Sequence, residues 1–340
     1  MAAKEFLYVS NADVKALLTP ADAVRLARET LVEYANDAID WSEPRQANLA
    51  VRDSLTRYKV KGCVLHDTGV AGFRVLSLHR SEEGYALAAH RPTKNVMLSD
   101  PATGEFFGIV DERWGYGLRT GACAAVAIEC LRTPDSTDCS ILGTGHMAYA
   151  TALTVNEVMP LDHMRVYSRD PQRRKAFADR LSTELGITVT ASDDAESCVR
   201  DASVVITATE AMSPIVEYAW LRPGVVVYAM GGGQECDLDC YRRMRFLVDE
   251  REQIAICTEM RAWREDGTYD SLVVEADLAE VVTGRAGQRT NPEDQFLVRS
   301  QGLQTQDVRQ AYWVYEQARK HGRGISLEPA LTERAGDPLF

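Results

Sequence analysis

The sequence lacks any apolar run long enough to cross a membrane. No stretch approaches the ~20 consecutive apolar residues that a membrane-spanning helix needs. The N-terminal sequence MAAKEFLYVSNADVKALL also has no uninterrupted hydrophobic segment of the kind found in secretory signals. We therefore expect a cytoplasmic protein with no membrane partner.

A surplus of basic charge is absent as well. The 38 Lys and Arg residues are outnumbered by 50 Asp and Glu residues, which gives a formal net charge of −12. The sequence has no stripe of Lys or Arg with interleaved aromatic residues, the pattern that attracts a phosphate backbone or anionic lipid. These features argue against nucleic acid as a partner.

The cysteines do not form a metal-binding pattern. There are eight, scattered along the chain, and the one close pair is Cys236 with Cys240. A structural zinc site needs four Cys or His ligands, and the sequence has no second such pair nearby. We expect reduced thiols and no bound metal.

The composition that remains is that of a globular protein. A chain of 340 residues exceeds what one hydrophobic core usually serves, so we expect two domains, or one domain with a large insertion. Apolar residues make up 45%, charged residues 26%, and the mean hydropathy is −0.24. These values are typical of a soluble enzyme without a long disordered tract.

The first third of the chain changes from helix to sheet patterning. Thr19 and Pro20 open a predicted helix, because Thr can cap a helix and Pro suits its first position. β-branched and aromatic runs follow at residues 58–64, 72–78, 95–99 and 105–110, with a turn at 100–104. This predicts a mostly antiparallel sheet, followed by an Ala-rich helix over residues 118–131.

Beyond residue 135, short apolar strands alternate with helices. Six strands are predicted at residues 139–143, 164–167, 187–191, 203–209, 225–230 and 246–248, with helices at 147–158 and 171–185. This alternation is typical of an α/β fold with a doubly wound parallel sheet. An amphipathic helix is predicted over residues 305–321.

The motif Gly143-Thr144-Gly145-His146-Met147-Ala148 lies between the first of these strands and the helix that follows. In a dinucleotide-binding Rossmann fold, the first glycine makes the tight turn and the second lets the pyrophosphate approach the backbone. Ala148 allows close helix packing, and the helix N-terminus offers N–H groups to the phosphates. The motif predicts a nicotinamide dinucleotide site and hydride chemistry.

The strand ends suggest which dinucleotide binds. Ser168 and Arg169 follow the second strand, where an acidic residue would hold the ribose hydroxyls of NAD. Arg169 suits a 2′-phosphate, and Asp170 can simply cap the next helix, so we favour NADP over NAD. The fourth strand ends in Thr207, Ala208 and Thr209, small residues that suit either the nicotinamide ribose or a plain strand-to-loop turn.

Four segments together are similar to those of a known family. They are Pro44-Arg45; residues 118–122 (LRTGA); residues 143–148 with 207–209; and the late run from residue 281 (VVTG) through Arg299-Ser300 to Asp307 and Val308. In their order and spacing, the chain resembles the ornithine cyclodeaminase/mu-crystallin family, which includes alanine dehydrogenases and ketimine reductases.

The resemblance implies an architecture and a set of roles. It implies a homodimer in which residues 1–130 and 305–340 form a substrate-binding and dimerisation domain, and residues 131–304 form the Rossmann domain. Arg45 and Arg119 match the arginines that clamp a substrate carboxylate, a role suited to the planar guanidinium fork. Thr120, Met230, Gly231 and Ser300 are placed around the cofactor.

Two departures from the family pattern bear on mechanism. Arg74 stands where the family usually has a Lys near the reacting carbon, and Arg is a poor proton donor or acceptor. The family's Gly-Ala-Asp loop, whose Asp meets the substrate amino groups, is altered here over residues 231–237 (GGGQECD). Glu235 or Asp237 could substitute for that Asp, although Asp237 could instead cap the following helix.

These departures favour reduction over cyclodeamination, which needs both a base and a group that orients the distal amine. The preferred hypothesis is an NAD(P)H-dependent imine reductase or amino-acid dehydrogenase acting on a small α-imino or α-keto acid. Lys94, His79 and His90 are candidate proton sources, with Lys94 first because its segment aligns with family pocket residues. Ornithine cyclodeamination, and a mu-crystallin-like protein that binds NADP without catalysis, remain the alternatives.

Overall fold

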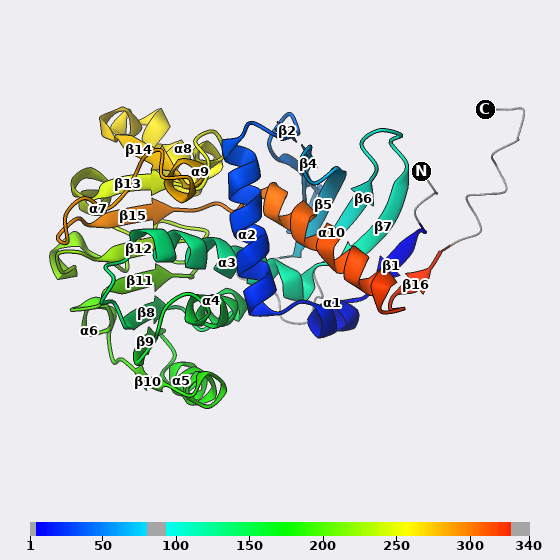
Figure 1. Ribbon diagram of the computed structural model, residues 1–340. Helices are drawn as coiled ribbons and strands as arrows, with labels where there is room; N and C mark the ends of the chain where they lie inside the picture. The colour runs from blue at the N-terminus through cyan, green and yellow to red at the C-terminus, as the bar shows by residue number, and fades with distance from the viewer. Residues whose placement is uncertain (1–4, 80–92, 328–340) are drawn as a thin grey trace, which may run out of the picture. The chain divides into compact units, whose positions relative to one another are not determined.

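A computed structural model of the chain describes residues 5–79 and 93–327, and divides it into two compact units (Figure 1). The first unit comprises Met1–Thr19, Asp37–Tyr116 and Gln304–Phe340. The second comprises Pro20–Asn36 and Gly117–Leu303. Residues 20–36 and 117–130 thus group with the Rossmann unit, whereas the sequence assigned them to the substrate domain.

The first unit contains an eight-stranded sheet in the order β16-β1-β7-β6-β5-β4-β2, with β3 paired to β4. All its strand pairs are antiparallel except β1 with β7. The predicted sheet is therefore confirmed and extended at both edges. The strands are β1 (Leu7–Val9), β2 (Ile39–Trp41), β3 (Ala47–Ala50), β4 (Thr56–Leu65), β5 (Val70–His79), β6 (Lys94–Ser99), β7 (Phe106–Asp111) and β16 (Ile325–Ser326).

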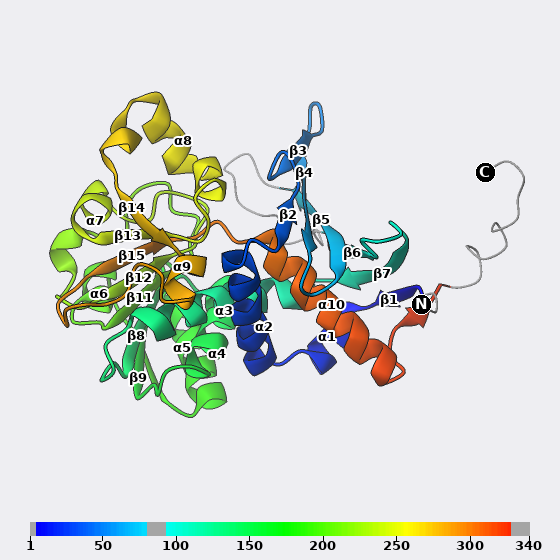
Figure 2. The same ribbon diagram turned by 45° about the horizontal axis from the view of Figure 1, so that its top comes forward.

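Helix α10 (Gln304–Lys320) covers one face of this sheet, as Figures 1 and 2 both show. Its buried side includes Val308 and Tyr315, whose apolar surface is removed from water against the strands. A Cβ placed on Gly72 of β5 would lie 2.9 Å from Val308, so glycine is what lets helix and strand approach so closely. Helix α1 (Asn11–Leu17), capped by Ser10, was not predicted.

The opposite face of the sheet is largely apolar among the described residues, and part of it is exposed. Phe73 of β5 pairs with Met97 of β6, and Met97 pairs with Ile109 of β7, so the three side chains lie on one face of the sheet. This is the face away from α10. The same register places Val75, Val60 and Tyr58 on this face, together with Leu49 of β3. Leu49 is 64% exposed and Phe73 is 42% exposed. We call this set of residues the outer sheet face.

The second unit contains an all-parallel sheet in the order β10-β9-β8-β11-β12-β15-β13-β14. The predicted doubly wound sheet is confirmed, and two strands, β14 and β15, are added to the predicted six. The strands are β8 (Asp138–Leu142), β9 (His163–Tyr167), β10 (Thr188–Ala191), β11 (Val204–Thr207), β12 (Val226–Ala229), β13 (Arg245–Val248), β14 (Val274–Asp277) and β15 (Phe296–Arg299).

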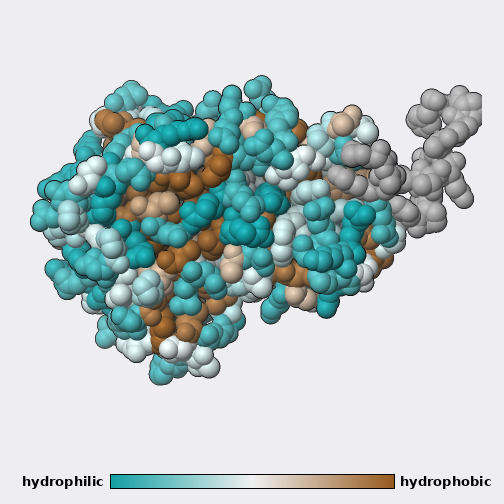
Figure 3. Space-filling model, in the orientation of Figure 1, coloured by the Kyte–Doolittle hydropathy of each residue, from teal (hydrophilic) through white to brown (hydrophobic). Residues whose placement is uncertain are grey.

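The second unit also contains α-helices. They are α2 (Pro20–Ala35), the part of α3 (Arg113–Leu131) from Gly117 onward, α4 (His146–Asn156), α5 (Pro171–Leu185), α6 (Ala195–Val199), α7 (Leu238–Arg243), α8 (Thr258–Glu265) and α9 (Leu278–Val282), with 3-10 turns at Tyr218–Trp220, Gln253–Ile256 and Thr268–Ser271. In the described part of the chain, no helix is long and apolar enough to span a bilayer. Hydrophilic side chains cover much of the face shown in Figure 3, and apolar ones gather near α3 and α4.

Candidate active site

The glycine motif forms a sharp turn between β8 and α4. Gly143 follows β8 with φ of +117°, a conformation that side chains rarely adopt. A Cβ at this position would also lie 2.5 Å from the carbonyl oxygen of Ala208, which follows β11. Gly145 is the N-cap of α4 and has open space where a side chain would begin. The backbone at this turn can therefore approach a ligand closely.

The turn lies at the topological switch point of the parallel sheet. β8 is the point from which β9 and β10 extend to one side and β11 and β12 to the other. In open α/β sheets, ligands bind at the carboxyl ends of the strands at such a point. Thr144 and Met147 are half-buried, His146 is exposed, and Ala148 is fully buried. The N-terminus of α4 is thus placed to receive phosphate groups.

The end of β9 leads into a capped helix. The Asp170 carboxylate accepts hydrogen bonds from the backbone N–H groups of Gln172 and Arg173, at 2.9 and 3.1 Å, and so caps α5. The structure thus confirms the capping role of Asp170. Ser168 is half-buried and Arg169 is exposed on the chain just before this cap.

Glu235 joins three segments beneath the strand ends. One carboxylate oxygen accepts hydrogen bonds from the Thr207 hydroxyl at 2.6 Å and from the Gly231 N–H at 2.7 Å. The other accepts from the Thr209 N–H and hydroxyl, both at 2.7 Å. The side chain is 1% exposed, and burial raises the pKa of Glu235 while its hydrogen bonds oppose that rise.

This arrangement corrects one expectation about the altered loop. Glu235 is not available to meet a substrate amine, because its carboxylate already holds the ends of β11 and β12. Asp237 accepts a hydrogen bond from the Cys240 N–H and is the N-cap of α7. Both acids of this loop are thus engaged in hydrogen bonds within the protein. Met230, half-buried between β12 and Gly231, has its sulfur 3.6 Å from the Thr151 hydroxyl.

Arg119 lies against a loop that follows β15. It is 3% exposed, and its guanidinium packs on Gly302, where an added Cβ would be 2.4 Å from Arg119 Nη1. Asp249 holds this loop by accepting hydrogen bonds from the Ser300 hydroxyl at 2.9 Å and from the Gly302 N–H at 2.6 Å. The hydroxyl of Ser300 is therefore used within the protein. Thr120, beside Arg119 on α3, is also buried.

Arg299 also holds the segments that follow β12 and β15. It is 1% exposed, is paired with the buried Glu259, and donates to the carbonyl oxygens of Ala229, Gly231 and Ser300. Gly231 is thus held on both sides, since its N–H donates to Glu235 and its carbonyl accepts from Arg299. Sequence reasoning named Arg299 only within the segment that carries the family resemblance, without a role, and did not name Asp249, because their partners lie on distant segments.

The first unit gathers a second group of charged residues. Arg74 is 3% exposed and pairs with the fully buried Asp307 of α10 at 2.9 Å. Its guanidinium lies 5.5 Å from the ring centre of Tyr116, and the Lys94 ammonium lies 3.8 Å from the same ring centre. The structure therefore brings Arg74 and Lys94 together around an aromatic ring that the sequence did not point to.

The other first-unit candidates lie elsewhere. Arg45 lies between β2 and β3 with its guanidinium 4.5 Å from the ring centre of Trp41. His79 ends β5, where its ring nitrogen hydrogen-bonds the Thr56 hydroxyl at 2.8 Å. His90 lies outside the described residues. These neighbours show what each side chain contacts within the first unit.

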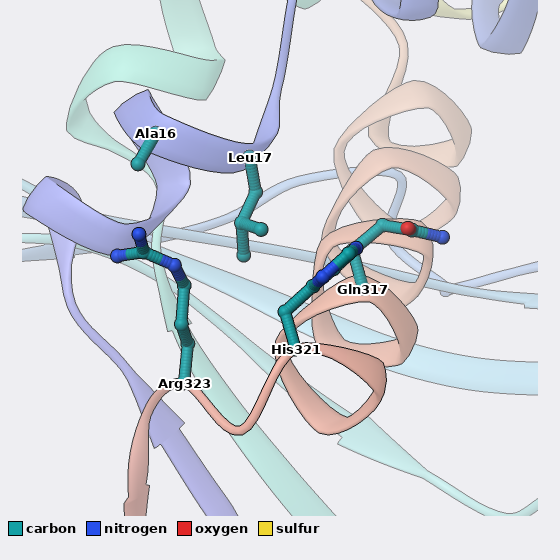
Figure 4. Close-up of a pocket in the computed structure, with 5 residues that line it drawn as sticks. All are labelled: Ala16, Leu17, Gln317, His321 and Arg323. Carbon is teal, nitrogen blue, oxygen red and sulfur yellow. The ribbon is translucent and has the colours of Figure 1, made fainter.

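A shallow groove in the first unit is lined by Ala16, Leu17, Gln317, His321 and Arg323 (Figure 4). Arg323 is paired with Asp13 at 3.3 Å. His321 directly follows the C-terminal end of α10 and Asp307 lies in its first turn, roughly 20 Å away along the helix axis. The groove is therefore separate from the Arg74 and Tyr116 group.

The eight cysteines are all unbridged. Cys236 and Cys240 are fully buried at the start of α7. Within the described ranges, no group of three His, Cys, Asp or Glu side chains could hold a metal ion.

The family model of ornithine cyclodeaminase/mu-crystallin proteins matches residues 5–322. The chain belongs to this family. A Delta(1)-pyrroline-2-carboxylate reductase of Bacillus cereus is 27% identical over 68% of this chain and 73% of its own. An alanine dehydrogenase of Archaeoglobus fulgidus is 24% identical over 95% and 98%. The ketimine reductase mu-crystallin of Mus musculus is 27% identical over 72% and 74%.

Solved structures share the fold of this chain. The Delta(1)-pyrroline-2-carboxylate reductase of Thermococcus litoralis, in complex with NADH and L-proline, has a TM-score of 0.87 at 24% identity and covers 95% of this chain and 100% of its own. A lysine cyclodeaminase has a TM-score of 0.79 at 22% identity over 99% and 98%. The fold is thus shared by proteins whose names give different activities.

Proposed function

We propose that this family member is an NAD(P)H-dependent reductase of a small α-imino acid, or an amino-acid dehydrogenase acting on the corresponding α-keto acid. Hydride would pass from the nicotinamide to the carbon beside the carboxylate. The observation that carries the proposal is the Gly143 turn, with its positive φ and the N-terminus of α4 at the switch point of the sheet.

Arg119 is the proposed carboxylate ligand in the second unit. Its guanidinium is buried and oriented by the loop that Asp249 holds, so a substrate would meet a donor group that is already in place. Arg45, which stacks on Trp41, is the proposed second arginine of the clamp. Small carboxylated amines and imines are also the compounds in the names of the relatives.

Three charged side chains favour reduction over cyclodeamination, because each is already engaged within the protein. Cyclodeamination needs a base and an acid that orients the distal amine. Arg74, in the position of the family Lys, is a guanidinium neutralised by Asp307. Glu235 is occupied by four hydrogen bonds and Asp237 caps α7. Reduction of a preformed imine requires only a carboxylate clamp, a hydride donor and one proton.

We propose NADP as the preferred cofactor. Asp170 is committed to capping α5, which leaves Ser168 and Arg169 as the side chains at the end of β9. A guanidinium there suits a 2′-phosphate better than a free ribose hydroxyl. The solved reductases of Thermococcus litoralis and Paracoccus denitrificans hold NADH and NAD+ in their own structures. On this proposal, the chain therefore differs from them in its preferred cofactor.

We propose a homodimer that buries the outer sheet face. Leu49 and Phe73 expose large apolar surfaces on one side of a sheet whose other side is covered by α10. Exposed apolar patches of this kind mark interaction surfaces. A solved archaeal alanine dehydrogenase with a TM-score of 0.87 is described as a dimer.

The test is a substrate panel followed by cofactor absorbance. The purified chain is mixed with NADPH or NADH and with cyclic ketimine carboxylates, or with 2-oxo acids plus ammonia or amines. The proposal expects cofactor oxidation with at least one of them, and a lower KM for NADPH than for NADH. Conversion of ornithine to proline and ammonia without net change in cofactor absorbance would instead assign a cyclodeaminase. Tight cofactor binding without turnover on either panel would assign a non-catalytic binding protein.

A further inference from the structure

Arg299, the last residue of β15, carries a charge that is enclosed within the second unit. Its Nε donates to the carboxylate of Glu259 on α8, and both side chains are 1% exposed. The second carboxylate oxygen of Glu259 has no hydrogen-bond partner in the described part of the chain. Replacing a buried ion pair by well-packed apolar side chains is often neutral or stabilising, so stability alone does not account for this pair.

The guanidinium of Arg299 holds three backbone carbonyl groups at the carboxyl ends of β12 and β15. Nη1 donates to the carbonyl oxygens of Ala229 at 3.2 Å and of Ser300 at 2.7 Å. Nη2 donates to the carbonyl oxygen of Gly231 at 3.0 Å. Because β12 and β15 are paired strands, one planar group fixes the orientation of the peptides that follow both of them.

The loop that Arg299 holds is continuous with the glycine turn of the proposed cofactor site. The Gly232 N–H donates to the Thr209 carbonyl oxygen at 3.2 Å, and a Cβ on Gly143 would lie 2.5 Å from the Ala208 carbonyl oxygen. The ends of β8, β11 and β12 are therefore adjacent. In a fold of this kind the dinucleotide crosses the switch point, with its adenosine half toward β9 and its nicotinamide half toward β11 and β12.

The accessible part of the loop flanks the peptide that Arg299 fixes. Gly231 is buried, and a Cβ there would lie 2.3 Å from the Thr209 carbonyl oxygen. Met230 before it is half-buried, and Gly232 after it is exposed. A Cβ on Gly232 would meet no atom within 4 Å, so a ligand can approach the backbone at this point. Fixing Gly231 therefore also fixes the two residues that can face a ligand.

We propose that Arg299 is a positioning residue for the nicotinamide half of the cofactor and acts through the Gly231 peptide. The inference rests on the proposed function. Glu259 orients the guanidinium, the guanidinium holds the Gly231 and Ser300 carbonyls, and residues 230–232 are thereby ordered before a cofactor binds. A loop that is already ordered loses less conformational entropy on binding, which strengthens affinity. The adenosine half, on the β9 side, gains nothing from Arg299.

The test compares each whole dinucleotide with its adenosine fragment. Titration calorimetry gives the dissociation constants of NADPH and 2′,5′-ADP, and of NADH and AMP, for the wild type and for Arg299→Lys. This variant keeps a positive charge beside Glu259 and loses the planar fork. We expect the dinucleotide that the wild type prefers to bind about tenfold or more weakly. Its fragment should bind within about twofold of the wild type, because it does not reach the loop.

Arg289→Lys is the matched control. Arg289 also donates to backbone carbonyls, including those of Gly224 and Asp294, but these precede β12 and β15 at the amino ends of the strands. This variant should lower Tm and leave all four dissociation constants unchanged.

A double variant separates positioning from folding. Arg299→Met alone leaves the Glu259 carboxylate buried without its cation, whereas Arg299→Met with Glu259→Leu removes both charges. The double variant should therefore unfold at a higher temperature than Arg299→Met. It should still show the selective loss of dinucleotide affinity, because the fork is absent.

Two results would overturn the inference. Equal weakening of a dinucleotide and its fragment would show that Arg299 supports the fold in general. Unchanged dinucleotide affinity in Arg299→Lys or in the double variant would show that the loop does not depend on the fork. A wild type that binds a dinucleotide but reduces no substrate would reject the proposed reaction alone, since the affinity ratios do not require turnover. A wild type that binds neither NADPH nor NADH would overturn both.

Discussion

Replacing Glu235 with Ala should destabilise the second unit and loosen the cofactor loop. The change removes the acceptor for two buried backbone donors, the N–H groups of Thr209 and Gly231, and for two threonine hydroxyls. Each buried backbone donor left without a partner costs about 1–3 kcal/mol, so we expect a loss of about 4 kcal/mol in the free energy of unfolding. In a unit of this size that corresponds to a fall of roughly 10 °C in Tm.

The assay is thermal unfolding together with NADPH titration. Asp237→Ala in the same loop is the matched control. It removes a half-buried helix cap that also accepts a hydrogen bond from the Tyr218 N–H at 3.2 Å, and it should cost about 1–2 kcal/mol. Glu235→Ala should also weaken NADPH binding by about tenfold or more, equivalent to about 1.4 kcal/mol, since Thr207, Thr209 and Gly231 lose their common anchor. A Tm shift no larger than that of Asp237→Ala would refute the reasoning.

The stability difference between the wild type and Glu235→Ala should change with pH in one direction. Burial raises the pKa of Glu235 above its ordinary value of 4.5, so the folded protein holds this proton more tightly than the unfolded chain does. The stability that arises from this shift is fully present below the ordinary value and is lost as the pH rises through the folded value. The stability advantage of the wild type over Glu235→Ala should therefore shrink with increasing pH. Tm measured across the pH range checks this.

Three further changes test other parts of the structure. Gly143→Ala should weaken NADPH binding about tenfold or more, as measured by fluorescence titration, because a positive φ and the nearby Ala208 carbonyl both oppose a Cβ; unchanged affinity would contradict the phosphate-loop assignment. Arg119→Lys should lower kcat/KM about 100-fold with cofactor affinity retained, because an ammonium cannot replace the bidentate fork; wild-type kinetics would remove Arg119 from the clamp. Phe73→Glu should shift the chain from dimer to monomer in sedimentation, whereas a persistent dimer would place the interface elsewhere.

Local patterns were enough to predict much of the second unit. Strands β8 to β13 are short apolar runs, and the Gly143 motif follows the first of them. The apolar pattern therefore predicts the strands, and the glycines predict the turn. The cap at Asp170 and the αL end of α5 at Gly186 are also local features. Strands β14 and β15, of four residues each, lack a distinctive pattern and were not predicted as strands.

The chemistry of the site was less predictable, because it depends on residues far apart in the chain. Arg74 and Asp307 are separated by 233 residues, and their pairing arises only when α10 packs on the sheet. Glu235 was considered as a substrate ligand, since the sequence cannot show that Thr207 and Thr209 fold back onto it. Tyr116 carried no signal until Lys94 and Arg74 were found around its ring.

The division of the first unit around the second has a consequence for synthesis on the ribosome. Strands β4 to β7 are made before residue 117, whereas α10, which buries one face of their sheet, begins at Gln304. The dinucleotide fold between them, with α2 already made, can close first, because domains fold as their segments emerge. Until α10 is made, Arg74 has no Asp307 to pair with. A chain halted at Leu303 would therefore carry a complete parallel sheet and an antiparallel sheet without the helix that buries one of its faces.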